Sequence, residues 1–223
     1  MPFGFLRDDG SDRLDRIEAT LQRMFGDDRH AFDLAMSTLL GGAAPHSVGA
    51  ELRATDHRVN EAEREIRREL VVHASVHGGI DTPAILIYMS IVKDVERIGD
   101  YAKNLFDLAY DGARLETAPD AEALTALQFD ISRLISDAGD VFAARDPERA
   151  REVLMHGDQL LDDFDDRVSN LVRGDDQGPE AVARALAYRY LKRIVAHLMN
   201  VLSAVVVPID RLDYFDEDPE DRH

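Results

Sequence analysis

The sequence has 223 residues, of which 45% are hydrophobic and 31% charged, with a formal net charge of −18 and no cysteine. This length and apolar content suffice for a packed core in one large or two small domains. The absence of cysteine excludes disulfides, thiolate metal ligands and thiol catalysis. The negative charge argues against a nucleic-acid partner, because affinity for a phosphate backbone depends on cationic side chains.

The sequence pattern favours a cytoplasmic protein. Its first residues, MPFGFLRDDGS, lack the basic region and the apolar run of a secretory signal. The longest apolar run, from Val201 to Ile209, is much shorter than a membrane-spanning helix and contains Pro208. Arginine supplies nearly all the cations, and the chain has three lysines, which are Lys93, Lys103 and Lys192.

Apolar residues at helical spacing predict three helices in the first half of the chain. Their expected ranges are about 14–39, 48–73 and 84–112. The glycine pair at 41–42 ends the first helix. The segment HGGIDTP separates the second from the third, and its Asp81 or Thr82, followed by Pro83, is a favourable helix start.

Three further helices are predicted in the second half, at about 120–144, 146–172 and 179–209. Asp146 followed by Pro147 is a typical helix start. No stretch shows sustained strand alternation. The sequence therefore predicts an all-α protein of two tandem, antiparallel three-helix bundles. We expect the first bundle at 1–116, the second at 117–213, with the boundary near ETAPDAEA, and a disordered acidic tail at 214–223.

The two halves resemble each other in sequence. The acidic and amide residues of the second and fifth helices have the same mutual spacing, at an offset of 102 residues: Asp56, Asn60 and Glu63 correspond to Asp158, Asp162 and Asp165. In the third and sixth helices, ERIGDYAKN from Glu96 aligns with KRIVAHLMN from Lys192, at an offset of 96 residues. This pattern indicates an internal duplication with a shorter inter-helix turn in the second copy.

The third predicted helix carries two carboxylates, Glu96 and Asp100, one turn apart. Its apolar stripe should face the core and comprises Ile91, Val95, Ile98, Ala102, Leu105 and Ala109. On a helical wheel the two carboxylates lie opposite this stripe, which by itself is typical of a solvated face. Gly99 lies between them, where glycine costs about 1 kcal/mol relative to alanine. We therefore expect some group to approach the backbone closely there.

A second row of polar side chains could complete a site with this pair. Asp56, Asn60 and Glu63 flank the apolar face of the second helix. Because that helix and the third should be antiparallel neighbours, the row could face Glu96 and Asp100. Five oxygen-bearing side chains would then converge, and oxygen ligands of this kind suit magnesium, manganese or iron, while carboxylates also bind zinc.

These motifs resemble those of a known family. RVNEAE, followed by a turn and then by VKDVERIGDYAKN, is similar to the signature of PhoU-type phosphate-signalling regulators. The resemblance implies two tandem three-helix bundles and a non-enzymatic regulator of inorganic phosphate uptake and phosphate-starvation signalling. It implies a phosphate transporter component, a membrane sensor kinase or both as partners. Membrane association would occur through these partners only, and a homodimer is left open.

The resemblance also implies a metal site in the first bundle only. Its ligands would be Asp56, Asn60, Glu63, Glu96 and Asp100, with Asp94 as a further ligand. The metal would be a divalent or trivalent ion, and iron, zinc, manganese and magnesium all remain open.

The second half departs from the family pattern. Lys192, Val195 and Ala196 stand where the first half has Glu96, Gly99 and Asp100. Two ligands are therefore missing and the glycine gap is filled, so we expect no metal cluster in the second bundle. Lys192 could instead reach the row formed by Asp158 and Asp162 and neutralise it.

Two other functions remain open at this stage. A metal-free helical scaffold for protein contacts would account for the altered second motif. A di-metal carboxylate enzyme is less favoured, because its ligands project into the core of a helical bundle, whereas Glu96 and Asp100 are expected on the outer face.

Overall fold

The computed structural model describes residues 11–77, 81–174, 178 and 180–212, and this part of the chain is helical without strands. The elements are α1 (Ser11–Leu39), α2 (Pro45–His77), α3 (Thr82–Tyr110), α4 (Ala121–Ala144), α5 (Pro147–Arg173), α6 (Ala181–Val206) and a short 3-10 helix, η1 (Ile209–Arg211). The segment 214–223, for which disorder is predicted, lies outside the described residues.

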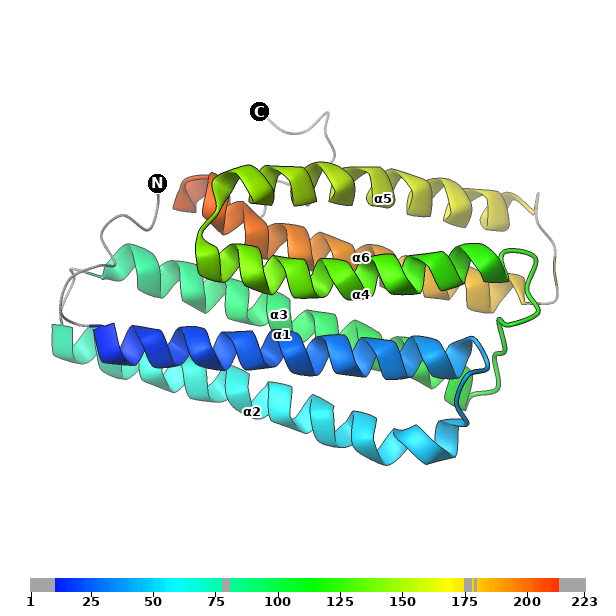
Figure 1. Cartoon of the computed structure of the whole chain (residues 1–223), viewed down its shortest axis with the longest axis horizontal. Coiled ribbons are helices and arrows are strands. Elements are labelled where there is room, and N and C mark those ends of the chain that lie inside the picture. The colour runs from blue at the N-terminus through cyan, green and yellow to red at the C-terminus, as the bar shows by residue number, and fades with distance from the viewer. Residues whose placement is uncertain (1–10, 78–80, 175–177, 179, 213–223) are drawn as a thin grey trace.

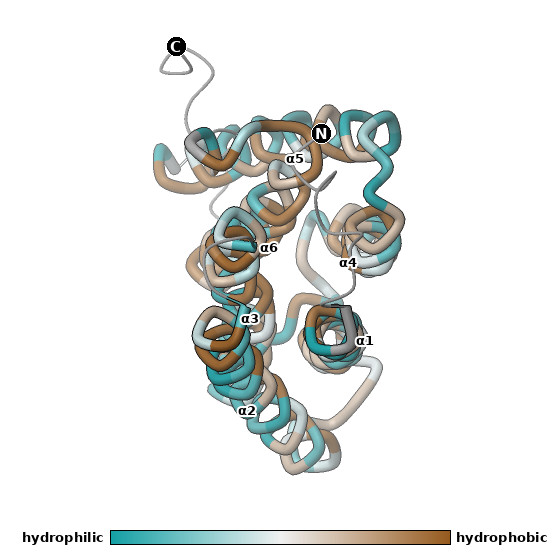
Figure 2. Tube along the Cα trace, turned by 90° about the vertical axis from the view of Figure 1, so that its left-hand side faces the viewer, coloured by the Kyte–Doolittle hydropathy of each residue, from teal (hydrophilic) through white to brown (hydrophobic). Residues whose placement is uncertain are grey.

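The helices form two tandem antiparallel bundles, which confirms the predicted fold class (Figure 1). In the view along the helices, α2, α3, α6 and α5 form one row, and α1 and α4 lie beside it in a second layer (Figure 2). The bundles α1–α3 and α4–α6 meet where α3 packs on α6 and α1 packs on α4. The predicted boundary at 116/117 falls in the connector between α3 and α4.

One continuous apolar core runs through both bundles. Its largest fully buried side chains include Tyr88, Phe32, Phe142, Phe164 and Tyr188. Because α3 packs against α1, α2 and α6, it is buried over most of its circumference. Among the helices of the described ranges, none has the apolar length that a bilayer crossing needs.

Several helix ends follow from local sequence. The Asp146 side chain caps α5 by accepting from the backbone N–H groups of Glu148 at 3.0 Å and Arg149 at 3.1 Å. Gly174 ends α5 in the left-handed region, with φ of 80°. Helix α3 begins at Thr82, as predicted. The Asp81 carboxylate does not cap it but bonds to Nε2 of His73 at 2.8 Å.

The predicted ranges of two helices are wrong. Helix α2 is longer at both ends, because Pro45 occupies a first-turn position, where its missing N–H is tolerated, and the helix continues to His77. Helix α6 ends at Val206 rather than near residue 209. Val207 is extended, with φ of −117° and ψ of 158°, because a residue that precedes proline is disfavoured in helical conformation.

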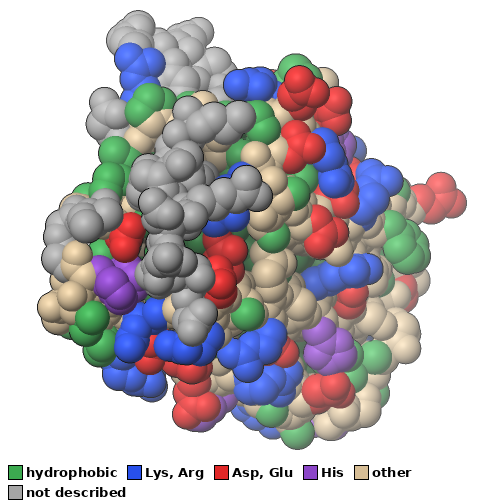
Figure 3. Space-filling model, turned by 60° about the vertical axis from the view of Figure 1, so that its left-hand side comes forward, with side chains coloured by type: hydrophobic (Ala, Val, Ile, Leu, Met, Phe, Trp, Pro, Cys, Tyr) green, Lys and Arg blue, Asp and Glu red, His purple; other side chains and the backbone are tan. Residues whose placement is uncertain are grey.

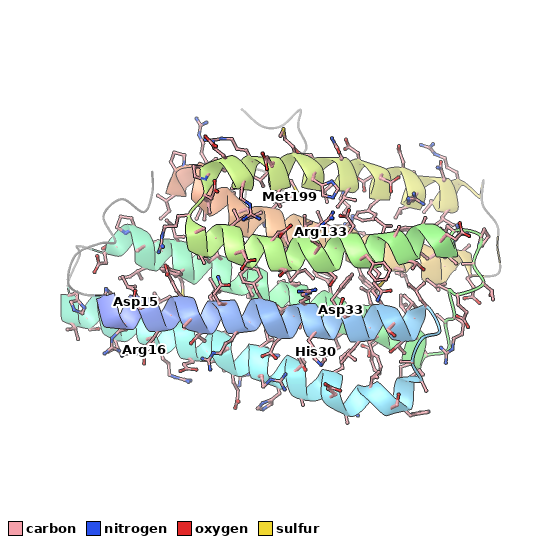
Figure 4. All side chains as sticks on the ribbon, in the orientation of Figure 1. Asp15, Arg16, His30, Asp33, Arg133 and Met199 are labelled. Carbon is pink, nitrogen blue, oxygen red and sulfur yellow. The ribbon has the colours of Figure 1, made fainter. Side chains whose placement is uncertain are left out.

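The second bundle is held by a close contact between α5 and α6. A Cβ at Gly157 would lie 2.6 Å from the Sδ atom of Met199, which Figure 4 labels between the two helices. The missing side chain therefore lets the Met199 thioether pack against the backbone of α5.

Candidate metal centre

Gly99 of α3 faces a carboxylate from α1. A Cβ at Gly99 would lie 2.6 Å from Oδ1 of Asp28 and 3.8 Å from Cγ1 of Val59. The expectation that a group approaches the backbone here is confirmed, and this group is the Asp28 side chain. The contact also shows that α1, α2 and α3 come together at this point, since Val59 belongs to α2.

Glu96 does not lie on a solvated face, and that prediction is wrong. The residue is buried, with 7% exposure, because α3 packs against neighbours on several sides. Its Oε2 atom accepts from Nζ of Lys93 at 2.6 Å. Among the described residues, the only partner of this buried carboxylate is therefore a flexible lysine side chain. A metal ion could replace that lysine as the partner.

Asp100 lies nearer the surface, with 31% of its side chain exposed, and pairs with Arg97 at 3.2 Å. Burial and the neighbouring Glu96 carboxylate raise the pKa of Asp100 above its usual value, although Arg97 and two lysines oppose the shift. The carboxylates of Glu96 and Asp100 therefore repel each other across one helical turn. Such repulsion is expected between metal ligands to which no ion is bound.

One residue of the row on α2 lies close to α3. Asp56 lies 3.5 Å from Nζ of Lys103 on α3, which fixes the side of α3 that the row faces. The amide of Asn60 donates to the backbone carbonyl of Asp56 at 2.9 Å. Glu63 pairs with Arg67 at 3.0 Å, and 13% of its side chain is exposed. Nearby, burial raises the pKa of Asp107, and Asp111 and Asp56 add to the shift.

Asp94 points away from this group and toward α6. Its Oδ1 atom accepts from Nδ1 of His197 at 2.8 Å and from Nδ2 of Asn200 at 3.1 Å. Both of these donors belong to α6. The structure therefore places Asp94 in the contact between the two bundles and not with the other predicted ligands.

Asp28 is a site residue that the sequence analysis missed. It is completely buried, and neither carboxylate oxygen has a hydrogen-bond partner within the described part of the chain. Burial raises its pKa well above the usual value, and the nearby carboxylates of Asp27, Glu96, Asp100 and Asp56 raise it further. A signal was available, because Asp28 lies on the apolar stripe of the first helix, between Phe25 and Phe32.

The residue types fit a metal ion, but their side chains are not arranged around a common point. As the side chains stand, no three acidic or histidine groups in residues 11–77, 81–174 and 180–212 are close enough to hold an ion. The acidic side chains point instead to lysine and arginine partners. The features that fit a metal are the oxygen donors, the unpartnered carboxylate of Asp28 and the space at Gly99.

The second bundle has a lysine at the corresponding place. Nζ of Lys192 donates to Oδ2 of Asp165, so its acidic partner is the third member of the row and not the pair Asp158 and Asp162 named from sequence. Val195 and Ala196 are buried. An ammonium group thus neutralises part of the acidic row in this half of the molecule.

Surface charge is mixed on one face of the molecule. Figure 3 shows acidic and basic side chains interspersed over one face of the molecule. The net charge of −18 is therefore not gathered into a single acidic patch on this face, and local pairs decide the electrostatics of the site.

Part of the chain is similar in sequence to a known domain family. Residues 21–109, which include all the predicted ligands, match the PhoU domain family. The chain carries a PhoU domain. A Synechocystis protein named phosphate-specific transport system accessory protein PhoU homolog is 25% identical over 198 residues, which cover 86% of this chain and 87% of that protein. A PhoU homolog 1 of Thermotoga maritima is 42% identical over 50 residues, 22% of this chain and 21% of that protein.

Solved PhoU structures share the fold. PhoU from Pseudomonas aeruginosa superposes with a TM-score of 0.75 at 23% identity, covering 86% of this chain and 95% of that one. The phosphate transport system regulatory protein PhoU from Streptococcus pneumoniae gives a TM-score of 0.70 at 15% identity, covering 87% and 95%. The resemblance to the PhoU family seen in the sequence is confirmed.

Proposed function

We propose that this protein is a regulatory accessory protein of inorganic phosphate uptake, which binds a metal ion on its first bundle. The observation that carries the regulatory part is the match to the PhoU domain at residues 21–109, together with similarity over 86% of the chain to a protein named as a phosphate-transport accessory protein. Its partners are a phosphate transporter component, a membrane sensor kinase or both. Signalling then passes through contacts with these partners in the cytoplasm, and the protein does not itself turn over a substrate.

The metal-binding part rests on the group formed by Asp56, Asn60, Glu63, Glu96 and Asp100. Asp94 is left out because its carboxylate bonds to α6. The bound ion would neutralise the mutual repulsion of these carboxylates and would link α2 to α3. Binding and release of the ion would then alter the outer surface where a partner docks.

A metal-free scaffold is the second candidate, and one observation favours it. All three lysines of the chain are paired with acidic residues of the two motifs: Lys93 with Glu96, Lys103 with Asp56 and Lys192 with Asp165. Most cations of this chain are arginines. At the two acidic motifs, the lysine ammonium groups could provide the positive charge that a bound metal ion would otherwise supply.

Metal content decides between the two candidates. The purified protein is compared by elemental analysis with Glu96→Ala/Asp100→Ala and with Asp158→Ala/Asp162→Ala, a matched change in the second bundle. Stoichiometric metal that is lost only in the first double variant supports the metal-binding regulator. No metal in any of the three proteins supports the scaffold.

The regulatory role is tested separately in cells. Deletion of the gene should alter phosphate uptake and the expression of phosphate-starvation genes, and the wild-type gene should restore both. Unchanged uptake and expression in the deletion strain would contradict the proposal whatever the metal content.

A further inference from the structure

We propose that Asp28 of α1 is a direct metal ligand, so that the site is built from three helices rather than two. This inference rests on the metal binding proposed above, and it adds a ligand from a helix that the sequence motifs of the site do not include.

The first argument is the burial of Asp28. Its side chain is completely buried and both of its oxygens lack a hydrogen-bond partner in the described residues. Burying an unpaired carboxylate is costly, and an apolar residue would pack better on this stripe between Phe25 and Phe32. The carboxylate therefore indicates a partner that none of the described residues supplies.

The second argument is its direction. Asp28 points at the backbone of Gly99, the residue between Glu96 and Asp100, and a side chain at Gly99 would lie 2.6 Å from its Oδ1 atom. Oδ1 of Asp28 therefore lies against the turn of α3 that carries both carboxylates. The missing side chain at Gly99 leaves room for this approach.

The third argument is the balance of charges around Asp28. Each neighbouring carboxylate has one basic partner: Glu96 has Lys93 at 2.6 Å, Asp100 has Arg97 at 3.2 Å, Asp56 has Lys103 at 3.5 Å and Asp27 has Arg58 at 2.6 Å. In the described part of the chain, Asp28 is the member of this group without such a partner. A bound cation would supply the positive partner that Asp28 lacks.

The expected ligand is a small cation that prefers oxygen donors, of the Mn²⁺, Fe²⁺ or Mg²⁺ class, with Zn²⁺ also accepted by carboxylates. To bind it, Glu96 and Asp100 turn away from Lys93 and Arg97, whose side chains are 40% and 47% exposed and can move into solvent. A bound ion would be held by Asp28 of α1 together with the carboxylates of α3, so metal binding should stabilise the packing of α1 in the bundle.

The test measures binding of Mn²⁺, Zn²⁺ and, without oxygen, Fe²⁺ to the full chain after removal of metal with a chelator. Isothermal titration is run on wild type, Asp28→Asn, Glu96→Gln and Asp27→Asn. Asp27 is the matched control, because it is adjacent in sequence but pairs with Arg58 on α2. We expect Asp28→Asn and Glu96→Gln to weaken binding at least about 10-fold, and Asp27→Asn to leave it unchanged.

A stability measurement separates a ligand from a merely structural residue. Without metal, Asp28→Asn and the apolar Asp28→Val should melt at or above the wild-type temperature, because a buried carboxyl group without a hydrogen-bond partner among the described residues is replaced. With saturating metal, only the wild type and Asp27→Asn should show a further rise. A metal-free protein that melts lower when Asp28 is replaced, with metal affinity unchanged, would overturn the proposal.

The remaining outcomes are also decisive. Loss of binding in Glu96→Gln but not in Asp28→Asn would overturn the role of Asp28 and leave the proposed metal-binding function intact. If the wild type binds none of the three ions, both the metal-binding function and the role of Asp28 are overturned.

Discussion

The imidazole of His197 stacks on the ring of Tyr101, with ring centroids 5.7 Å apart and planes inclined by 21°. These residues are 96 positions apart, the offset that relates α3 to α6 in the internal duplication. Asp94 and Tyr190 are related by the same offset, and each contacts one member of the stacked pair: Asp94 bonds to His197, and Tyr190 packs 6.0 Å from Tyr101. The bundles therefore meet through equivalent positions that have acquired different chemistry.

Asp94→Ala should destabilise the contact between the two bundles. It removes the acceptor of both His197 and Asn200, whose side chains are buried. Leaving buried donors without a partner costs about 1–3 kcal/mol in the free energy of unfolding. Chemical denaturation followed by circular dichroism measures this loss, and Asp94→Asn, which keeps an acceptor oxygen, should lose less.

The same variant separates the structural role of Asp94 from the ligand role that the sequence suggests. Because its carboxylate points to α6, Asp94→Ala should leave the affinity for Mn²⁺ unchanged. Reduced metal affinity without a loss of stability would show that Asp94 turns to the metal site.

The six helices and their pairing follow from the sequence, because apolar spacing and turn residues act locally. Asp146 with Pro147 starts α5 as these residues dictate. The ends of α2 and α6 were predicted less accurately than the start of α5. At the end of α6 the apolar run continues past Val206, and the backbone restriction imposed by Pro208 outweighs it.

The site was predicted less completely than the fold, for a reason that lies in the packing. A helical wheel assigns one buried face, but α3 contacts three helices, so Glu96 is buried although it lies opposite the main stripe. Asp28 could not be linked to Gly99 from sequence, since the contact joins α1 and α3 across 71 positions. An acidic residue on an apolar stripe was the available signal.

The stability of the metal-free protein should fall with rising pH because of Asp28. Burial raises its pKa in the folded state well above the usual value of 3.8, so the folded protein binds a proton that the unfolded chain releases above about pH 4. When the folded state holds more protons, the free energy of unfolding decreases as pH rises between the two pKa values. Asp28→Asn lacks this group, so its stability relative to wild type should grow with pH.

This pH dependence is measured by urea denaturation in the presence of a chelator, at several pH values from 4 upward. Because Asp100 and Asp107 have raised pKa values as well, the informative quantity is the difference between wild type and Asp28→Asn at each pH. A difference that does not change with pH would show that Asp28 keeps the same protonation state on folding.

Gly99→Ala should destabilise the protein, although alanine normally favours a helix. An alanine in place of a mid-helix glycine stabilises by about 0.5–1 kcal/mol. Here the new Cβ would lie 2.6 Å from Oδ1 of Asp28, and such overpacking costs about 1–3 kcal/mol. Adding Asp28→Ala removes the clash, so the double variant should recover stability, which denaturation of all four proteins in the cycle measures.

Gly26→Ala is the matched control for that cycle. Gly26 lies on α1, and a Cβ there would meet nothing within 4 Å. This variant should therefore gain about 0.5–1 kcal/mol. If Gly99→Ala gained as much as Gly26→Ala, the contact between Gly99 and Asp28 would not be close in solution.

Lys192 should contribute to stability through charge rather than through a metal. Its ammonium pairs with Asp165, with 20% and 53% of the two side chains exposed, so Lys192→Met should cost no more than about 1 kcal/mol. Lys192→Glu should cost more, because it adds a like charge beside Asp165, and the difference between the two variants should shrink at high salt. Denaturation at low and high salt in the presence of a chelator measures both. Equal stability of Lys192→Glu and wild type at low salt would show that the acidic row needs no neutralising cation.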